Sequence, residues 1–296
     1  MNSYNTNSNK SVRFYIVLII MLFFMACDYQ REETKLKVSF TRSGDIYVMD
    51  EDGSNTKQLT MFGTNDYSSW SPDGDKIVFH SNRDGNDEIF IMNADGGDQI
   101  QLTNTLAPVF NRYPTFTLDG NSIIYLEYIN PNYSFKIISL DGTLLKQFAA
   151  PSSPLGISVS PDGKSFIDTD GAGWISQISM ETGLLVQLTS PSYLSPSWSS
   201  DGTFIIVRDS SFNIRIIDMA LTIPIVPVVI YTNSSPITGL ALSPDSKTII
   251  FAKTPNSPGV DGLYTISKNG TDLRQLTVSP DLVYPDSNPC YQFKPR

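Results

Sequence analysis

The sequence predicts an all-β fold, a six-bladed β-propeller built from four-stranded antiparallel blades. Three observations lead to this prediction: a recurring turn motif, short β-rich runs between its copies, and complementary fragments at the two ends of the chain. The copies of the motif are SWSPDG, TFTLDG, SVSPDG, SWSSDG and ALSPDS, and their aspartates lie 46, 43, 39 and 44 residues apart. A period of about forty residues is the length of one propeller blade.

Each period contains short runs rich in β-branched and aromatic residues, which favour strands. The first run directly follows the motif and is KIVF, SIIY, SFI, FIIV or TIIF. A second run follows a polar loop, as in EIFIMN, FKIIS, GWISQIS, NIRIID and LYTIS, and a third closes the unit, as in IQLT, LLKQF, LLVQLT, VPVVIY and LRQLT. Together with the stretch that leads into the motif, each period supplies four strands, and no segment has sustained helical spacing.

The two ends of the repeat region complement each other. Residues 37–60 supply three strands of a blade and lack the leading one, whereas NPCYQF at residues 288–293 matches a leading strand after which the chain ends. Five complete periods and these two fragments make six blades. The ring is therefore expected to close by pairing of the C-terminal strand with the N-terminal blade, which removes exposed sheet edges.

The frequent Asp-Gly pairs allow two interpretations, as oxygen ligands of a calcium loop or as turns between strands. The pairs at Asp73 and Asp95 lie between runs that form hairpins, where Asp-Gly favours the required backbone conformation. A calcium loop also needs ligands at alternate positions and a distal glutamate, and none of these windows continues that pattern. We therefore interpret them as turns.

The amino terminus is expected to be a lipoprotein signal peptide over residues 1–26, followed by a lipidated Cys27 and a tether over residues 27–36. An apolar run of thirteen residues, Phe14 to Ala26, follows Lys10 and Arg13. As a helix it would span only about 20 Å of a bilayer core of about 30 Å, which favours a secretory signal over a membrane anchor. The ending FMAC resembles a bacterial lipobox. The alternative is an ordinary signal with a chance cysteine.

The charge balance restricts the partners of the mature chain. Residues 1–26 hold two of the 21 basic residues and none of the 30 acidic ones, so the remainder carries a formal charge of −11. Such a charge disfavours nucleic acid and anionic lipid surfaces as partners. Contact with a membrane is expected only through the lipid anchor, at the outer membrane or the periplasmic face of a Gram-negative cell envelope.

The repeats resemble a known propeller family. IYVMDEDGSNTKQLT, IFIMNADGGDQIQLT and SWSPDGDKIVFHSNRDGNDEIF are similar to the TolB-type repeat, and the resemblance extends over about residues 37–293. It implies a TolB-like β-propeller over residues 37–296. TolB itself carries an α/β domain before its propeller and docks a peptidoglycan-associated lipoprotein, whereas this sequence passes from signal to tether to propeller. We therefore expect a similar module without assuming TolB's partner.

Enzymatic activity is not expected. The chain has a single histidine, His80, within the strand run KIVFHSN, so neither a Ser-His-Asp triad with its own domain nor a histidine-rich metal site is available. No cofactor is expected, and a divalent cation in or near the central channel is kept as an alternative. His80 is interpreted as a strand residue that faces a neighbouring blade.

The second strand of the third repeat contains an unusual acidic residue. Asp168 occupies the position that Phe79 and Val207 hold in other repeats, and strands in the middle of a blade are covered on both faces. Asp168 and Asp170 lie at alternate positions, as in a weak cation site. A frayed strand in the most degenerate repeat is the favoured alternative, because the next alternate position is Ala172.

A partner surface is predicted on the face of the ring that carries the longer loops. Tyrosine and arginine are enriched in protein interfaces, and loops on a rigid scaffold commonly bind partners. The candidate residues at the channel mouth and at the ends of second strands on this face are Asp66, Tyr67, Arg112, Tyr113, Arg42, Arg83 and Arg208.

These observations favour a non-catalytic cell-envelope lipoprotein whose propeller is a scaffold for another envelope protein. The alternative is recognition of a glycan or other small ligand at the channel mouth. A hydrolase or lyase is the least favoured function, because the chain has only one histidine.

Overall fold

The computed structural model describes most of the repeat region. The described residues are 35–150, 153–190, 192–220, 227–232, 235–254, 262–278 and 286–292. The chain divides into two compact units, Met1–Lys35 and Leu36–Arg296. The segments expected to be a signal peptide and, for the most part, a tether, together with Cys27, thus lie outside the described residues. Within the described part, no helix is long and apolar enough to cross a membrane.

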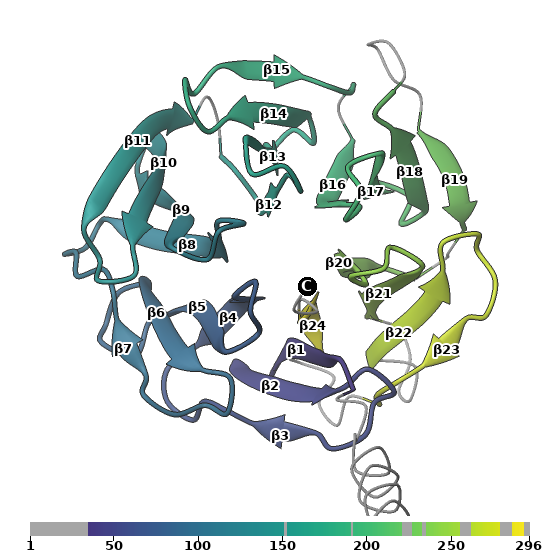
Figure 1. Cartoon of the computed structure of the whole chain (residues 1–296), viewed down its shortest axis with the longest axis horizontal. Helices are drawn as coiled ribbons and strands as arrows, with labels where there is room; N and C mark the ends of the chain where they lie inside the picture. The colour runs from purple at the N-terminus through teal and green to yellow at the C-terminus, as the bar shows by residue number, and fades with distance from the viewer. Residues whose placement is uncertain are drawn as a thin grey trace, which may run out of the picture. The chain divides into compact units, whose positions relative to one another are not determined.

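The described residues from 36 to 292 form six four-stranded antiparallel sheets arranged as the blades of a ring (Figure 1). From the centre outward, blade A has β24 (Ser287–Tyr291), β1 (Lys37–Arg42), β2 (Asp45–Asp50) and β3 (Lys57–Gln58). Blade B has β4 (Asn65–Trp70), β5 (Lys76–Ser81), β6 (Glu88–Asn93) and β7 (Ile100–Gln101), and blade C has β8 (Phe110–Phe116), β9 (Ser122–Ile129), β10 (Asn132–Ser139) and β11 (Leu144–Ala150). Blade D has β12 (Ile157–Val159), β13 (Ser165–Thr169), β14 (Ile175–Ser179) and β15 (Leu185–Gln187). Blade E has β16 (Tyr193–Trp198), β17 (Phe204–Asp209), β18 (Ile214–Asp218) and β19 (Val228–Tyr231), and blade F has β20 (Ile237–Leu242), β21 (Thr248–Lys253), β22 (Gly262–Ser267) and β23 (Arg274–Gln275).

The ring closes as the sequence predicts. The C-terminal strand β24 pairs antiparallel with β1, in a register that puts Val38 opposite Tyr291 and Ser39 opposite Cys290. Gln292 extends the closure, because its backbone N–H donates to the carbonyl of Lys37 at 2.8 Å. The predicted all-β, six-bladed fold is therefore confirmed.

The Asp-Gly motifs are turns. In the first turn of blade B, the Ser71 hydroxyl donates to Asp73 Oδ1 at 2.5 Å, and the same oxygen accepts the N–H of Asp75 at 3.1 Å. Four other blades repeat this bond between a hydroxyl and an aspartate, at Asp119, Asp162, Asp201 and Asp245. In each motif, a carboxylate oxygen of the aspartate thus accepts hydrogen bonds within its own turn, as is typical of aspartate in a turn.

The glycine of a third turn has a different role, because it allows blades to approach one another. Gly142 has a φ of 87°, and a Cβ atom built on it would lie 2.5 Å from the carbonyl oxygen of Leu102 in the preceding blade's outer segment. Only glycine combines that backbone conformation with such a close contact.

The recurring QLT sequence fixes the outer strand of a blade. The Thr103 hydroxyl accepts the N–H of Ile89 at 2.9 Å and donates to Glu88 Oε2 at 2.5 Å, and the Gln101 side chain donates to the carbonyl of Thr103 at 2.7 Å. Thr60, Thr189 and Thr277 accept the corresponding N–H in their own blades.

Thr103→Val is expected to lower the free energy of unfolding by about 1–3 kcal/mol, because the variant removes the acceptor of the Ile89 N–H and the donor to Glu88. Urea denaturation measures the change. Thr56→Val is the matched control, because Thr56 is an exposed threonine in blade A, and it should change stability by less than about 0.5 kcal/mol. Equal effects of the two substitutions would contradict a special role for the QLT threonine.

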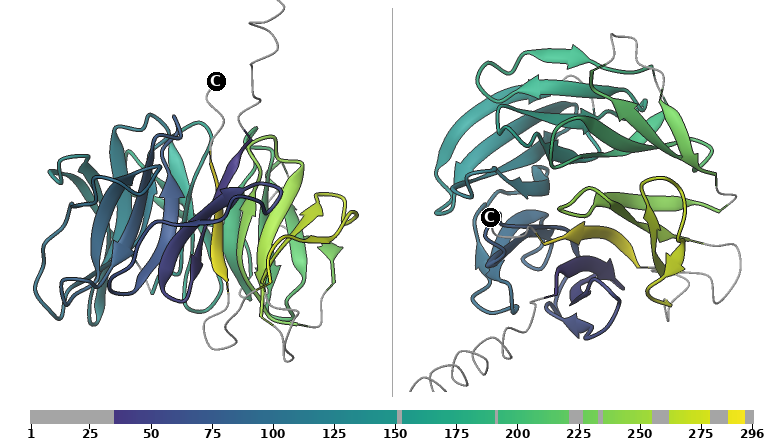
Figure 2. Two further views of the ribbon diagram at one scale, coloured as in Figure 1. Left: turned by 90° about the horizontal axis from the view of Figure 1, so that it is seen from below. Right: turned by 45° about the vertical axis from the view of Figure 1, so that its right-hand side comes forward.

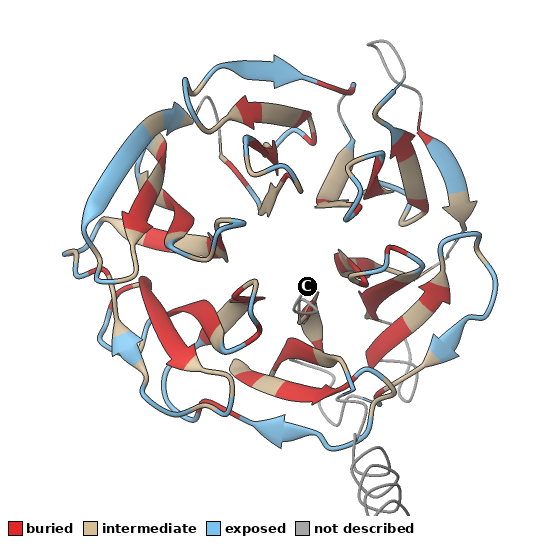
Figure 3. Ribbon diagram, viewed as in Figure 1, coloured by how far each residue is buried: buried red, intermediate tan, exposed pale blue. Residues whose placement is uncertain are grey.

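The hydrophobic core consists of clusters packed mainly between neighbouring blades. One cluster joins blades A and B through Ile46, Trp70 and Phe79, and another joins blades C and D through Phe135 and Phe166. Burial is greatest in the second and third strands, and the outermost strands are mostly exposed (Figure 3). A polar side chain without a hydrogen-bond partner is therefore expected to destabilise the fold most in the second strand of a blade.

The strands run between the two faces of the ring (Figure 2). We call one face the motif face, because it carries the first and third turns of each blade. In blade B, a hydrogen bond from the Ala94 N–H to the Asp75 carbonyl joins these two turns. We call the other face the link face, because it carries the second turn of each blade and the link to the next blade. A hydrogen bond from the Asn111 N–H to the Asp87 carbonyl joins the second turn of blade B to the start of blade C. One loop expected on the link face, YINPNYS, is instead a tight hairpin, because β9 and β10 continue to Ile129 and from Asn132.

Candidate functional site

A backbone irregularity positions side chains near the centre of the link face. Tyr67, Tyr113, Ser195 and Asn288 have φ values of 51°, 56°, 53° and 46°, and Gly239 has 61°. All five lie in the innermost strands, where the pairing with the second strand shifts register. Such a bulge changes the direction of a side chain, and a non-glycine residue in this conformation is held there by its surroundings.

Two of these residues form an aromatic group with His80. The rings of Tyr67 and Tyr113 meet edge to face at a centroid distance of 4.5 Å, and Tyr67 stacks on His80 at 5.6 Å. His80 and Tyr113 are 6.1 Å apart. Burial raises the pKa of both tyrosines above the usual value, so their hydroxyls remain protonated and available as hydrogen-bond donors.

Asp66 lies beside this group and connects blade B to two strands of blade A. Its Oδ1 accepts the Thr41 hydroxyl at 2.6 Å, the Asn288 amide at 2.8 Å and the N–H of Tyr67 at 2.8 Å. Thr41 belongs to β1 and Asn288 to β24, so Asp66 ties blade B to the strand pair that closes the ring.

Arg112 is held at the edge of the same region. Its guanidinium forms an ion pair with Asp87 and lies 5.5 Å from the ring centroid of Phe110. The Arg112 side chain is 43% exposed. We define the axial cluster as Asp66, Tyr67, His80, Arg112 and Tyr113, all in blades B and C.

The other predicted arginines are placed differently. Arg42 forms a two-pronged ion pair with the buried Asp286, and Arg83 donates to Gln99 and to Asn65. Both guanidinium groups also cover aromatic rings of their own blades. Their donors are therefore used within the fold rather than directed toward the axial cluster.

Arg208 differs from these arginines because no ion pair or side-chain hydrogen bond engages it within the described residues, and its Nε is buried without a partner. It lies in blade E, opposite blade B in the ring. Burial raises the pKa of Tyr67, and the positive charge of Arg208 opposes this shift. Burial lowers the pKa of Arg208 itself.

Asp168 is 4% exposed and its Oδ1 has no hydrogen-bond partner. Burial raises its pKa well above the usual value, against the effect of nearby backbone N–H groups. Asp170 Oδ1 accepts the N–H groups of Ala172 and Trp174 at 2.9 Å and so organises the turn between β13 and β14. Across the described ranges, no three histidine, cysteine, aspartate or glutamate side chains gather as a metal site would require.

His80 lies in β5 and contacts one ring of its own blade and one ring of blade C. It is 8% exposed, and its contacts are the rings of Tyr67 and Tyr113. Burial and the charge of Arg112 lower its pKa, against the opposing effects of Asp66 and Asp87, so the imidazole is neutral at pH 7.

Sequence reasoning did not identify Thr41 and Asn288 as members of this region. Asn288 is the residue of the closing strand equivalent to Tyr67, and counting positions along the leading strands would have identified it. The role of Thr41 depends on its hydrogen bond to the next blade, which no local pattern shows.

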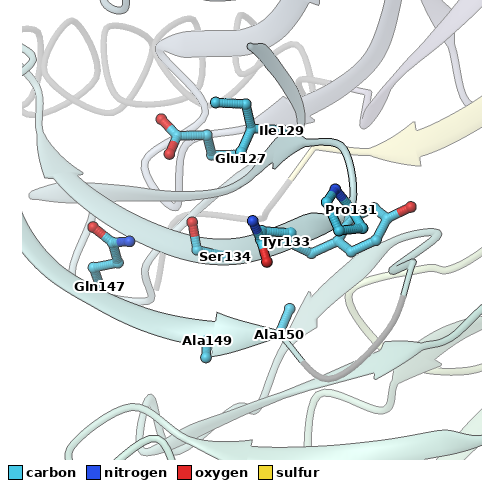
Figure 4. Close-up of a pocket in the computed structure, with 9 residues that line it drawn as sticks. Glu127, Ile129, Pro131, Tyr133, Ser134, Gln147, Ala149 and Ala150 are labelled. Atoms are coloured by element: carbon cyan, nitrogen blue, oxygen red, sulfur yellow. The ribbon is translucent and has the colours of Figure 1, made fainter. Parts of the chain in front are cut away.

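A separate hollow of about 660 Å³ lies on blade C, away from the axial cluster. Strands β9, β10 and β11 form it, and Glu127, Ser134 and Gln147 are among its lining residues (Figure 4). An ion pair between Glu127 and Lys136 already uses its principal charged group. The hollow therefore presents mainly neutral polar groups and small side chains.

Comparison with known proteins agrees with this architecture. The model of the TolB beta propeller domain matches residues 22–189, more than half of the chain. The structure is similar to that of TolB from Acinetobacter baumannii, with a TM-score of 0.72 and 19% identity over 88% of this chain and 67% of that one. It is also similar to a chain of a nidogen–laminin complex, with a TM-score of 0.70 and 10% identity over 88% of this chain and 100% of that one. At these identities the structural matches show the fold alone, and a search of curated proteins gave no match.

Proposed function

Because this chain belongs to the TolB β-propeller family, we propose that it is a non-catalytic scaffold that binds another protein of the cell envelope through its link face. We further propose that a lipid on Cys27 anchors it to the envelope membrane. The second proposal rests on the FMAC sequence at the end of the apolar run of the amino terminus.

The observation that carries the scaffold proposal is the axial cluster. Tyrosine and arginine side chains anchor protein interfaces when a rigid frame holds them, and here bulges in two inner strands fix Tyr67 and Tyr113. The partly exposed Arg112 adds a positive charge beside them. The loss of entropy on binding is small when the side chains are already ordered.

Photo-crosslinking in the native envelope tests the proposal. A photoreactive amino acid at Leu106, which is 85% exposed in the link between β7 and β8, is expected to capture one dominant protein. The same probe at Leu184 is the matched control, because Leu184 is also exposed but lies in a third turn on the motif face. Mass spectrometry identifies the captured protein.

Arg112→Glu should then reduce capture at Leu106 at least tenfold, because the variant reverses the charge beside the tyrosines and repels Asp87. Lys164→Glu makes the same change at an exposed site on the motif face and should leave capture unchanged. Equal capture at Leu106 and Leu184, or no sensitivity to Arg112→Glu, would contradict the scaffold proposal. Protection of the tyrosines by a soluble sugar, without any protein partner, would favour the small-ligand alternative.

A further inference from the structure

The second strands place one residue of each blade at an equivalent level of the ring. Strand register puts His80 opposite Asp66 in blade B, Arg208 opposite Leu194 in blade E, and Ala252 opposite Thr238 in blade F. Ala252 packs in the cluster shared by blades F and A. Residues at this level thus face the following blade.

At the seam between blades A and B, this level holds a complete donor and carboxylate pair. Thr41 of blade A donates to Asp66 of blade B at 2.6 Å, and Asn288 donates to the same oxygen. A partly buried carboxylate in this position therefore satisfies donors from two neighbouring strands.

The seam between blades E and F has the donors but not the carboxylate. By register, Arg208 in the second strand of blade E corresponds to Thr41 in the second strand of blade A, and Thr238 in the inner strand of blade F corresponds to Asp66 in blade B. Both Arg208 Nε and Thr238 Oγ1 are buried without a hydrogen-bond partner. Buried polar atoms are usually paired. Two unpaired donors at the positions that Thr41 and Asp66 hold in the other seam therefore indicate a missing acceptor.

Nearby blade D adds further groups of the same kind. Thr169 is fully buried with an unpartnered hydroxyl, and Asp168 beside it has an unpartnered carboxyl oxygen. Burial raises the pKa of Asp168 and so disfavours its charged form, whereas Arg208 brings a positive charge to the inner end of the neighbouring blade E.

From these contacts we propose that Arg208, with Thr238, forms a carboxylate-binding site at the seam between blades E and F. The planar fork of an arginine is suited to a carboxylate, which it binds with two parallel hydrogen bonds. Arg208 is only partly buried, so an anion can reach it from solvent. The carboxylate belongs either to a free organic acid or to the terminus of a protein chain bound as in the proposed function.

Thermal unfolding of the full-length chain in detergent tests the site with acetate as the probe. Sodium acetate is compared with sodium chloride at equal ionic strength and pH 7. Acetate is expected to raise the Tm of the wild type saturably relative to chloride, because a ligand that binds only the folded state stabilises it by mass action. The proposal would be overturned if the Tm were the same in acetate and in chloride up to an acetate concentration of about ten times a millimolar dissociation constant.

Arg208→Met is expected to raise the Tm in chloride, because it removes a desolvated cation, and to abolish the effect of acetate. Arg208→Lys keeps the charge without the fork and should retain only part of the effect. Arg274→Met is the matched control, because Arg274 is exposed in the outer strand β23 of blade F, and its response to acetate should equal that of the wild type. An acetate effect that persists in Arg208→Met would show binding elsewhere and overturn the proposal.

If Arg208→Met does not fold, the Nε–H resonance of Arg208 in arginine-labelled wild type gives the same answer, because acetate should shift it more than that of Arg274. Two compounds distinguish the sources of the carboxylate: N-acetyl-triglycine, which resembles the terminus of a protein chain, and its C-terminal amide, which lacks the carboxylate. Binding of the acid at least tenfold tighter than acetate indicates a chain terminus, and equal affinity indicates a free acid. These titrations use the isolated chain, so their failure is distinct from failure of the crosslinking experiment.

Discussion

Asp286→Ala is expected to lower the free energy of unfolding by about 3–5 kcal/mol, the effect of removing one partner from a buried ion pair. The Asp286 side chain has no exposed surface, and its two oxygens accept Arg42 Nε at 2.6 Å and Arg42 Nη2 at 2.8 Å. The Thr277 hydroxyl also donates to Asp286. The variant would leave the Arg42 charge without its carboxylate and the Thr277 hydroxyl without an acceptor.

The location of this pair increases its importance. Asp286 directly precedes the closing strand β24, and Arg42 ends β1, the strand with which β24 pairs. Loss of the pair therefore weakens ring closure as well as one contact. We expect hydrogen exchange to become faster in β24 and β1 than in blade D, and urea denaturation to measure the total loss.

Two comparisons separate the buried pair from charge effects in general. Lys247→Met disrupts the pair between Lys247 and Asp245, whose side chains are 80% and 58% exposed, and should cost no more than about 1 kcal/mol. The double variant Arg42→Met with Asp286→Ala should be more stable than Asp286→Ala alone, because no buried charge is left unpaired. A loss below about 1 kcal/mol for Asp286→Ala would contradict a closing role for this ion pair.

The blades and the closing strand could be predicted from sequence because their signals are local and repeated. The motif at Asp73 and its copies specify the turns, the QLT run at Thr103 ends a blade, and residues 288–293 match the missing leading strand. The same counting placed Tyr67 and Tyr113 at equivalent positions, and the structure brings their rings into contact.

The ion pairs could not be predicted in the same way. Arg42 and Asp286 are 244 residues apart, so only the closed ring shows that the Arg42 guanidinium is used inside the fold. Arg83 likewise uses its donors on Gln99 and Asn65. Arg208 is distinguished from them by the partner that it lacks, and a sequence pattern does not show missing partners.

Asp168→Val is expected to raise the free energy of unfolding at pH 7 by about 1–3 kcal/mol, the usual penalty for a buried polar group without a partner. Asp168 is 4% exposed and replaces apolar residues of other blades, including the fully buried Val207. Valine has the shape that this strand position accepts in blade E. Urea denaturation of the variant and the wild type at pH 7 measures the change.

The pH dependence of the stability distinguishes the charge of Asp168 from its shape. Burial raises the pKa of Asp168 in the folded state above the unfolded value of about 3.9. A group of this kind contributes stability that is fully present below the unfolded pKa and is lost as the pH rises through the folded pKa. The advantage of Asp168→Asn, which removes only the charge, should therefore be greatest at pH 7 and decline as the pH falls toward about 4. A cation held by Asp168 and Asp170 would give the opposite result, since both variants would then be less stable than the wild type, and a chelator would destabilise only the wild type.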